Sequence, residues 1–517
     1  MGMAELQLLE EQRMTYQVSL DDQKTQLERN KLGQFATPSA LAHDILNYAK
    51  TLMGETPIRF LEPSIGTGSF YSALQANFLR NQISKAQGYE IDKRFVDASR
   101  RLWQGTSLDV EHADFTKLSP PAGEDEKFNL IISNPPYVRH HHLGAEDKSR
   151  LQAKVAGVLG CKLSRLAGLY CYFMGIAHHW MQEGSIAAWL IPSEFMDVNY
   201  GRAIKHYLKN KVTLLHIHRF NPDDVQFDDA LVSSAVVWFR KAPPPPEHAA
   251  KFSYGGTMMS PSTIRSISQG GLSVDSKWTQ IAQYGLAEED HSPTIGDFFD
   301  VRRGLATGDN KFFIMTGDQA KERGIPPKFL TPILPSPRHL KISKIGSKKG
   351  GIPLLPKVSY LLDCRLEEKV VERKFPKLWA YLQSGIKQGV ADRYLCSNRK
   401  IWYAQEQRPA PLLACTYIGR PKNKGDNPFR FILNQSEATI TNTYLGIYPK
   451  PGVASTLMNS PDLAERLWQL LSSIPAEQLV KQGRVYGGGM YKLEPKELKK
   501  VRLRGLPKSL GEATLFS

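Results

Sequence analysis

An apolar segment that ends in a rigid polar tetrapeptide constrains this chain more than any other feature. Residues 128–133 read FNLIIS, which has the length and composition of a buried strand. Asn134-Pro135-Pro136-Tyr137 follows at once, and its prolines cannot donate backbone hydrogen bonds to a sheet. A carboxamide and an aromatic ring are therefore expected where a strand ends, the edge at which open α/β sheets bind ligands. The alternative is a strand followed by a proline-rich turn without chemistry.

Strand-like and helix-like segments alternate through the first half of the chain. The segments with strand character are 58–61, 86–91, 129–133 and 186–191, and those with helical character are 41–53, 70–79, 95–103 and 169–181. Thr37-Pro38-Ser39 offers caps and a first-turn proline to the first helix. This alternation predicts an α/β fold with a mostly parallel sheet covered on both faces.

Charge divides the chain unevenly. Residues 1–240 hold 26 Lys and Arg against 27 Asp and Glu, whereas residues 241–517 hold 41 against 24. The excess fits a polyanionic partner such as nucleic acid, or a solvated basic face without a partner. Pro243-Pro244-Pro245-Pro246 lies at the change and predicts a stiff spacer. We expect four parts, namely a helical arm (1–30), a catalytic domain (31–242), a linker (243–292) and a basic domain (293–517).

Composition argues against several classes of protein. No stretch of 18 apolar residues occurs, so we expect no membrane span, and the polar N-terminus is unlike a signal peptide. Five cysteines without a C-x-x-C pair fit a reducing cytoplasm and argue against structural zinc. His140-His141-His142 are adjacent and cannot all face one ion, so we expect no metal. Four lysines in 341–349 fit phosphate contacts and a solvated loop equally.

A glycine turn and two carboxylates predict a nucleoside-type cofactor. In Glu62-Pro63-Ser64-Ile65-Gly66-Thr67-Gly68-Ser69-Phe70 the glycines permit a tight turn before a helix. The third glycine of the dinucleotide fingerprint is missing. Glu90, at the end of the next strand, can accept hydrogen bonds from both ribose hydroxyls. Asp114-Phe115 can read and stack on an adenine, or can be a turn aspartate beside a core phenylalanine.

These motifs carry a resemblance to a family. Residues 31–240 resemble the DNA adenine-N6 methyltransferases of restriction–modification systems, in the subgroup of the TaqI and Eco57I enzymes. Gly33-Gln34-Phe35-Ala36-Thr37-Pro38 looks like the N-terminal motif that holds the methionine part of S-adenosylmethionine, and 134–137 looks like the catalytic motif. The order of motifs is the γ arrangement. The resemblance implies a Rossmann-like class I methyltransferase domain followed by an α+β target-recognition domain. It implies cofactor contacts at Phe35, Thr37, Pro38, Glu62, Pro63, Gly66, Gly68, Glu90, Ile91, Asp114, Phe115 and Asn134.

The resemblance also implies a mechanism. The Asn134 side-chain oxygen and the Pro135 carbonyl would accept the two N–H bonds of adenine N6, which aims the nitrogen lone pair at the sulfonium methyl group. Pro136 would help to hold the motif rigid, and Tyr137 would stack on the extruded base. Phe227, in Gln226-Phe227-Asp228-Asp229-Ala230, would be a second base contact. Gly168 departs from the Asp or Asn of relatives, which puts a minor substrate contact in doubt.

The second half resembles the same family more loosely. Residues 301–311 look like the opening of a target-recognition domain, which makes Arg302, Arg303 and Lys311 weak candidates for DNA contacts. Residues 441–444 and 486–489 carry motifs that recur in such domains. We therefore expect double-stranded DNA as the partner and a bacterial or archaeal cytoplasmic location. Residues 1–32 are too few for a nuclease domain, so any cognate restriction endonuclease would be a separate chain.

Two other readings stay open. A methyltransferase for RNA or for a protein glutamine side chain could share the Asn-Pro-Pro-Tyr motif, although glutamine-modifying relatives lack a basic domain of this size. A DNA-binding subunit with a vestigial pocket is the alternative from another class. Cofactor binding without methyl transfer to DNA would favour that second reading.

Overall fold

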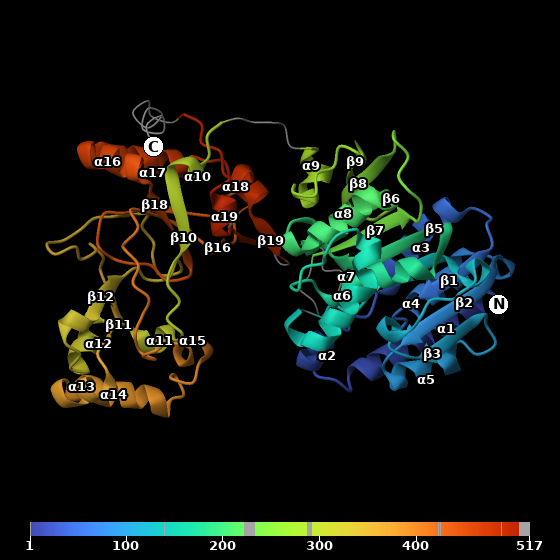
Figure 1. The fold of residues 1–517 in the computed structure, drawn as a ribbon, viewed down its shortest axis with the longest axis horizontal. Helices are drawn as coiled ribbons and strands as arrows, with labels where there is room; N and C mark the ends of the chain where they lie inside the picture. The colour runs from blue at the N-terminus through green and yellow to red at the C-terminus, as the bar shows by residue number, and fades with distance from the viewer. Residues whose placement is uncertain are drawn as a thin grey trace. The chain divides into compact units, whose positions relative to one another are not determined.

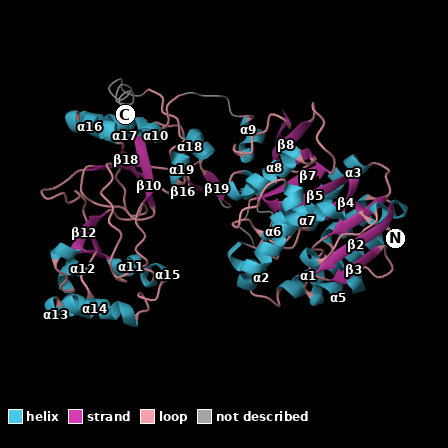
Figure 2. Cartoon of the chain, in the orientation of Figure 1, coloured by secondary structure: helices cyan, strands magenta, loops and turns pink. Residues whose placement is uncertain are grey.

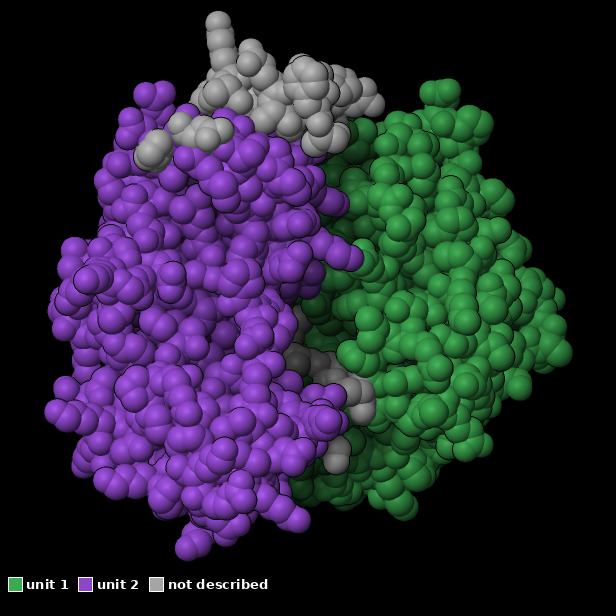
Figure 3. Space-filling model, turned by 60° about the vertical axis from the view of Figure 1, so that its left-hand side comes forward, with its two compact units in different colours: residues 1–288, 486–488 green, residues 289–485, 489–517 purple. Residues whose placement is uncertain are grey.

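The computed structural model describes residues 2–138, 140–221, 233–286, 292–421, 423, 425–486 and 489–505. The chain divides into two compact units, residues 1–288 with 486–488 (unit 1) and residues 289–485 with 489–517 (unit 2) (Figure 3). Figure 1 shows the element order and Figure 2 shows the distribution of helix and strand. No helix of the described residues is both long and apolar enough to cross a membrane.

One mixed sheet forms the centre of unit 1. Within the described residues its strand order is β3-β2-β1-β4-β5-β7-β6-β8-β9. The pairs β3-β2, β2-β1, β1-β4, β4-β5 and β6-β8 are parallel, and the pairs β5-β7, β7-β6 and β8-β9 are antiparallel. The strands are β1 (Ile58–Glu62), β2 (Ile83–Glu90), β3 (Leu108–His112), β4 (Phe128–Ser133), β5 (Met181–Pro192), β6 (Thr213–Arg219), β7 (Ser234–Arg240), β8 (Ala249–Gly256) and β9 (Pro261–Ser268).

The strand order reverses between β1 and β4. From β1 the chain first adds β2 and then β3 on one side, and β4 then pairs with β1 on the other side. Ligands of open α/β sheets bind outside the carboxyl ends of the strands at such a switch point. Asn134 directly follows β4, and Ser64 lies just after β1. The hydroxyl oxygens of Ser64 and Ser133 are 3.1 Å apart. The fold therefore brings the glycine turn and the Asn-Pro-Pro-Tyr motif to one edge.

Helices cover both faces of this sheet (Figure 1). Side chains alternate along a strand, so Phe60 and Leu130 enter the core under α3 and α4, whereas Leu61 and Ile131 enter the core under α6, α7 and α8. This two-sided burial explains the nearly continuous apolar strands of the sequence. The helices are α1 (Met3–Asp21), α2 (Gln26–Leu32), α3 (Ser39–Met53), α4 (Ser69–Asn77), α5 (Lys93–Leu102), α6 (Ala145–Leu159), α7 (Leu169–Ala177), α8 (Arg202–Asn210) and α9 (Ile281–Tyr284).

Two expectations for unit 1 differ from the structure. The helix expected over 169–181 ends at Ala177, because Trp180 is buried against Phe115 and Phe128 and this tertiary packing overrides the helical pattern. The segment expected as a linker, 243–292, contributes β8, β9 and α9 to unit 1. Ala250, Phe252, Ser253 and Gly255 of β8 are buried, and the pairing of β8 with β6 extends the sheet beyond the proline run.

Unit 2 combines small sheets with short helices, as expected of an irregular α+β domain. In its described residues the sheets have the orders β10-β18-β15-β17-β13, β11-β14-β12 and β16-β20-β19. The strands are β10 (Phe299–Arg303), β11 (Ile314–Thr316), β12 (Leu330–Ile333), β13 (Lys344–Ile345), β14 (Ser359–Leu362), β15 (Leu413–Thr416), β16 (Ile418–Gly419), β17 (Phe431–Asn434), β18 (Tyr444–Pro449), β19 (Arg484–Tyr486) and β20 (Met490–Lys492).

Among the described residues of unit 2, the helices contribute to two of its apolar cores. One core lies between the five-stranded sheet and the helices near the C-terminus, and the other lies under α13 and α14. The helices are α10 (Ile295–Phe298), α11 (Asn310–Phe313), α12 (Gly317–Glu322), α13 (Glu368–Lys374), α14 (Pro376–Lys387), α15 (Tyr394–Ser397), α16 (Pro451–Asn459), α17 (Pro461–Ser472), α18 (Ala476–Gln482) and α19 (Pro495–Leu498).

Candidate active site

The glycine turn joins β1 to α4 and needs both of its glycines. Gly66 and Gly68 have φ angles of +55° and +86°, in the region that favours glycine. A Cβ added to Gly68 would lie 2.6 Å from Trp103 Nε1, and that indole donates a hydrogen bond to the Thr67 carbonyl at 3.0 Å. Gly68 thus serves the packing of the turn and does not line the cavity beside it.

Glu90 holds the turn from the neighbouring strand. Its Oε2 accepts from the Gly66 backbone N–H at 3.0 Å, and its Oε1 accepts from the N–H groups of Ile91 and Asp92 at 2.9 Å each. Burial raises the pKa of the Glu90 carboxyl, and these backbone hydrogen bonds oppose the rise. The carboxylate is therefore fixed at the end of β2, beside the turn.

Glu62 is a buried carboxyl of the site with an unused acceptor oxygen. Its side chain is 3% exposed, and its Oε2 has no hydrogen-bond partner among the described residues. Burial raises the pKa of Glu62 well above its usual range, the Arg13 guanidinium lowers it, and Glu90 raises it further. A buried acceptor without a donor is costly, so this oxygen is suited to a ligand that brings a cationic donor.

Asp114 and Phe115 form the far wall beyond β3. Asp114 Oδ1 accepts from the Thr116 backbone N–H at 3.0 Å and from the Thr116 hydroxyl at 2.7 Å. The Phe115 ring is buried, with its centroid 5.6 Å from that of Phe173 and 5.1 Å from that of Trp180. Phe115 therefore forms part of an aromatic cluster that lies against the cavity.

Asn134 is held by the segment that precedes α3. Its Nδ2 donates to the Phe35 carbonyl at 2.9 Å and to the Thr37 hydroxyl at 3.1 Å. Its backbone carbonyl accepts from the Ser64 hydroxyl at 3.0 Å, which links the motif to the glycine turn. The Phe35 carbonyl and the Thr37 hydroxyl thus hold the carboxamide, and Ser64 holds the backbone of Asn134.

Tyr137 points into the protein rather than into the cavity. It is 8% exposed, and its hydroxyl donates to the Leu190 carbonyl at 3.1 Å. The Phe35 and Tyr137 ring centroids are 5.5 Å apart. Burial raises the pKa of the Tyr137 hydroxyl above its usual value, so the group stays protonated at neutral pH.

One cavity of about 310 Å³ brings most of the predicted residues together. The predicted residues that line it are Phe35, Thr37, Glu62, Pro63, Gly66, Glu90, Ile91, Asp114, Phe115, Asn134 and Pro136. Pro38, Gly68, Pro135 and Tyr137 are not among its lining residues. Phe227 lies outside the described residues. The cavity therefore joins the glycine turn to the Asn-Pro-Pro-Tyr motif.

Sequence reasoning missed the contribution of α1. Gln17 and Asp21 of this helix line the cavity, and Gln17 Oε1 accepts from the Thr67 hydroxyl at 2.8 Å. Arg13 is 3% exposed and donates to Thr67 Oγ1 at 3.1 Å. The sequence gives no strand end or glycine turn near these residues. The burial of the charged Arg13 points to a role for α1 in the site, but this burial is visible only in the structure.

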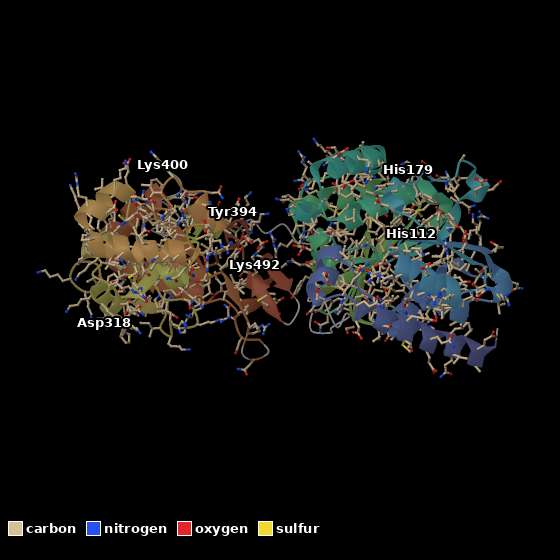
Figure 4. The ribbon with its side chains drawn as sticks, turned by 90° about the horizontal axis from the view of Figure 1, so that it is seen from below. His112, His179, Asp318, Tyr394, Lys400 and Lys492 are labelled. Atoms are coloured by element: carbon tan, nitrogen blue, oxygen red, sulfur yellow. The ribbon has the colours of Figure 1, made fainter. Side chains whose placement is uncertain are left out.

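The candidate DNA contacts lie at the surface of unit 2. The Arg302 side chain is 67% exposed. Arg303 donates to the Asn442 carbonyl at 3.0 Å, and its guanidinium lies 4.1 Å from the Tyr417 ring centroid, with Lys492 (labelled in Figure 4) 5.1 Å from the same ring. The Lys311 side chain is exposed at the start of α11. Tyr394 and Lys400, which Figure 4 labels, are also exposed in unit 2.

Two family profiles match this chain side by side. The profile described as "Eco57I restriction-modification methylase" matches residues 15–226, and the one described as "Type II methyltransferase M.Eco57I, C-terminal domain" matches residues 279–516. The chain belongs to the Eco57I family of restriction–modification DNA methyltransferases. The resemblance of its motifs to the Eco57I family is thereby confirmed, and the match extends over residues 279–516.

Relatives match over nearly the whole chain. The type II methyltransferase M.XamI of Xanthomonas campestris pv. amaranthicola is 27% identical over 485 residues, which cover 92% of this chain and 86% of the relative. The type II methyltransferase M.AccI of Acinetobacter calcoaceticus is 25% identical over 490 residues, covering 91% and 85%.

The fold also recurs in a larger solved structure. The cryo-electron microscopy structure of the DrdV–DNA complex has a TM-score of 0.51 at 11% identity. The match covers 95% of this chain and 57% of that protein. The expected α/β fold, a methyltransferase-like domain followed by a C-terminal domain, is confirmed.

Proposed function

We propose that this Eco57I-family enzyme transfers the methyl group of S-adenosylmethionine to N6 of an adenine in double-stranded DNA. One observation carries the proposal most strongly. The carboxamide of Asn134 and the glycine turn with Glu62 and Glu90 line the same cavity, so an amine acceptor and a nucleoside-type donor could meet there. Modification of this kind would protect DNA from a cognate restriction endonuclease carried on a separate chain.

The residues present fit S-adenosylmethionine. Glu62 Oε2, buried without a donor, suits the ammonium group of the methionine part. Glu90 suits the ribose hydroxyls, and Asp114 with Phe115 suits the adenine ring and its amino group. When bound, the cofactor supplies an electrophilic methyl group on a sulfonium.

The protein's own contribution is orientation and hydrogen bonding. Asn134 Oδ1 can accept one N–H of the substrate amine, which favours a pyramidal nitrogen with its lone pair available. Extrusion of the base from the duplex costs a few kcal/mol, and an aromatic contact can return about 1–3 kcal/mol. The family resemblance gives that contact to Tyr137, whose ring is buried beside Phe35 in this structure, so stacking on the base would require the ring to turn outward. Phe227 stays a candidate for a second contact.

The target base is the sharpest point to test. Long-read sequencing that detects modified bases, applied to DNA from cells expressing the protein, should report N6-methyladenine in one sequence context. N4-methylcytosine in that context would overturn the adenine assignment, although the reaction would still be methylation of an exocyclic amine. Methylated RNA or protein with unmodified DNA would overturn DNA as the substrate.

A matched pair of variants tests the catalytic assignment. Asn134→Ala should abolish methylation while cofactor affinity stays near that of the wild type. Asn77→Ala makes the same substitution at the end of α4, outside the cavity lining, and should keep full activity. Retained turnover in Asn134→Ala would contradict the role of the carboxamide.

A further inference from the structure

The Asn134 carboxamide has one chemically allowed orientation. The group opposite it at 2.9 Å is the Phe35 backbone carbonyl, which can accept a hydrogen bond and cannot donate one. Reversal of the amide would set two acceptor oxygens against each other. The NH₂ group must therefore face Phe35, whichever way a side-chain amide would otherwise be assigned.

The second N–H of the same amide is used by Thr37. Nδ2 donates to the Thr37 hydroxyl at 3.1 Å, and no described residue donates to Asn134 Oδ1. Asn134 itself lines the cavity. With both N–H bonds committed to the segment before α3, Oδ1 is left to accept a hydrogen bond from the substrate.

The segment that holds Asn134 is itself fixed to the motif. The Tyr137 backbone N–H donates to the Gly33 carbonyl at 3.0 Å, and a Cβ on Gly33, at φ +65°, would lie 2.4 Å from Tyr137 N. Thr37 is 7% exposed, and its carbonyl accepts from the Ser69 hydroxyl at 2.8 Å. The backbone of Thr37 is therefore anchored to α4, which limits where its hydroxyl can lie.

We infer that Thr37 is a positioning residue for methyl transfer, which acts by holding the Asn134 amide so that Oδ1 faces the substrate amine. The inference rests on the proposed function and goes beyond a contact between Thr37 and the cofactor. Without the hydroxyl, one N–H of Asn134 loses its acceptor and the amide is held by the Phe35 carbonyl alone. Its oxygen can then rotate away from the line of attack, which lowers the rate of the chemical step.

The test compares Thr37→Val, which keeps the shape and removes the oxygen, with Thr37→Ser, which keeps the oxygen. Single-turnover methylation at saturating DNA and S-adenosylmethionine should fall by about tenfold in Thr37→Val, the scale of one lost neutral hydrogen bond. Thr37→Ser should restore the rate. Equilibrium titration should give a cofactor affinity within about twofold of the wild type, because the lost hydrogen bond acts on Asn134 and not on the bound cofactor.

Two outcomes would overturn the inference. A wild-type single-turnover rate in Thr37→Val shows that the hydroxyl does not position Asn134. Weaker cofactor binding with an unchanged rate at saturation shows a plain cofactor contact instead. If thermal unfolding shows that Thr37→Val does not fold, Thr37→Ala removes the same oxygen and is judged in the same way. Failure of the proposed function looks different, because the wild type itself would then leave the DNA unmethylated.

Discussion

At the scale of single residues, Glu62 links cofactor affinity to the stability of the fold. Burial raises the pKa of its carboxyl, so the folded state favours the protonated form. For a carboxyl of this kind the contribution to stability is complete below the unfolded pKa and is lost as pH rises through the folded pKa. The ligand-free wild type should therefore lose stability as pH rises above the ordinary range of a carboxyl pKa.

Glu62→Gln removes the charge and keeps the shape. We expect its midpoint of thermal unfolding to depend less on pH than that of the wild type, while its affinity for S-adenosylmethionine falls by about 10- to 100-fold with the loss of a charged acceptor. Glu183→Gln is the matched control, since Glu183 is exposed and pairs with Lys241 outside the cavity. Equal pH dependence of unfolding in Glu62→Gln and the wild type would contradict this role.

Tyr137 allows its hydroxyl and its ring to be tested separately. Tyr137→Phe keeps the ring and leaves the Leu190 carbonyl without its donor, so stability should fall by about 0.5–1.5 kcal/mol while methylation stays near wild type. Tyr137→Ala also opens a cavity in the core, at about 3–5 kcal/mol, so its loss of activity would mix folding with base contact. Denaturant unfolding and single-turnover assays separate the two effects. An inactive Tyr137→Phe of normal stability would mean that the hydroxyl takes part in the chemistry.

At the scale of elements, helix α1 should act as a wall of the cofactor site. Gln17→Leu removes the acceptor of the Thr67 hydroxyl beside the glycine turn, so the cofactor dissociation constant should rise about three- to tenfold. Gln7→Leu is the control on the same helix, because Gln7 is exposed and lies outside the cavity lining. Equilibrium titration of the two variants decides the point, and equal affinities would remove α1 from the site.

The positions at which the strands of unit 1 end were predicted best from the sequence. The apolar runs before Glu62, Glu90 and Asn134 define short buried strands, and parallel strands bring their carboxyl ends to one edge, so three distant motifs could be assigned to one site. The position of α1 could not be predicted, because its contacts with Thr67 depend on tertiary packing that no local pattern encodes. The direction of the Tyr137 ring also depends on tertiary packing. The sequence placed an aromatic ring after the strand, but it could not show that the ring points into the protein.

At the scale of the whole molecule, the uneven charge of the chain becomes a property of unit 2. Five strands of its described residues form a sheet whose edge strand, β10, carries Arg302 and Arg303 at the surface. The sequence predicted this basic half and a nucleic-acid partner, yet it did not predict which cations stay available. The structure favours Arg302 over Arg303 as a candidate for DNA contact. Arg303 donates to the Asn442 carbonyl and lies over the Tyr417 ring, whereas the Arg302 side chain lies 3.8 Å from Asp300 and is largely exposed.

Salt dependence should separate phosphate contacts from solvated charges. If Arg302 and Lys311 each neutralise one DNA phosphate, each alanine variant should weaken binding at low salt and flatten the slope of log K against log salt by about 0.9. Lys93→Ala is the matched control, because Lys93 is equally exposed, pairs with Asp97 and belongs to unit 1. Fluorescence anisotropy with one duplex across a salt series gives the slopes, and cofactor affinity should stay constant in every variant. A cation that merely faces solvent releases no counterions when DNA binds. An unchanged slope in Arg302→Ala and Lys311→Ala would therefore show that DNA does not contact these two residues and binds another face of unit 2.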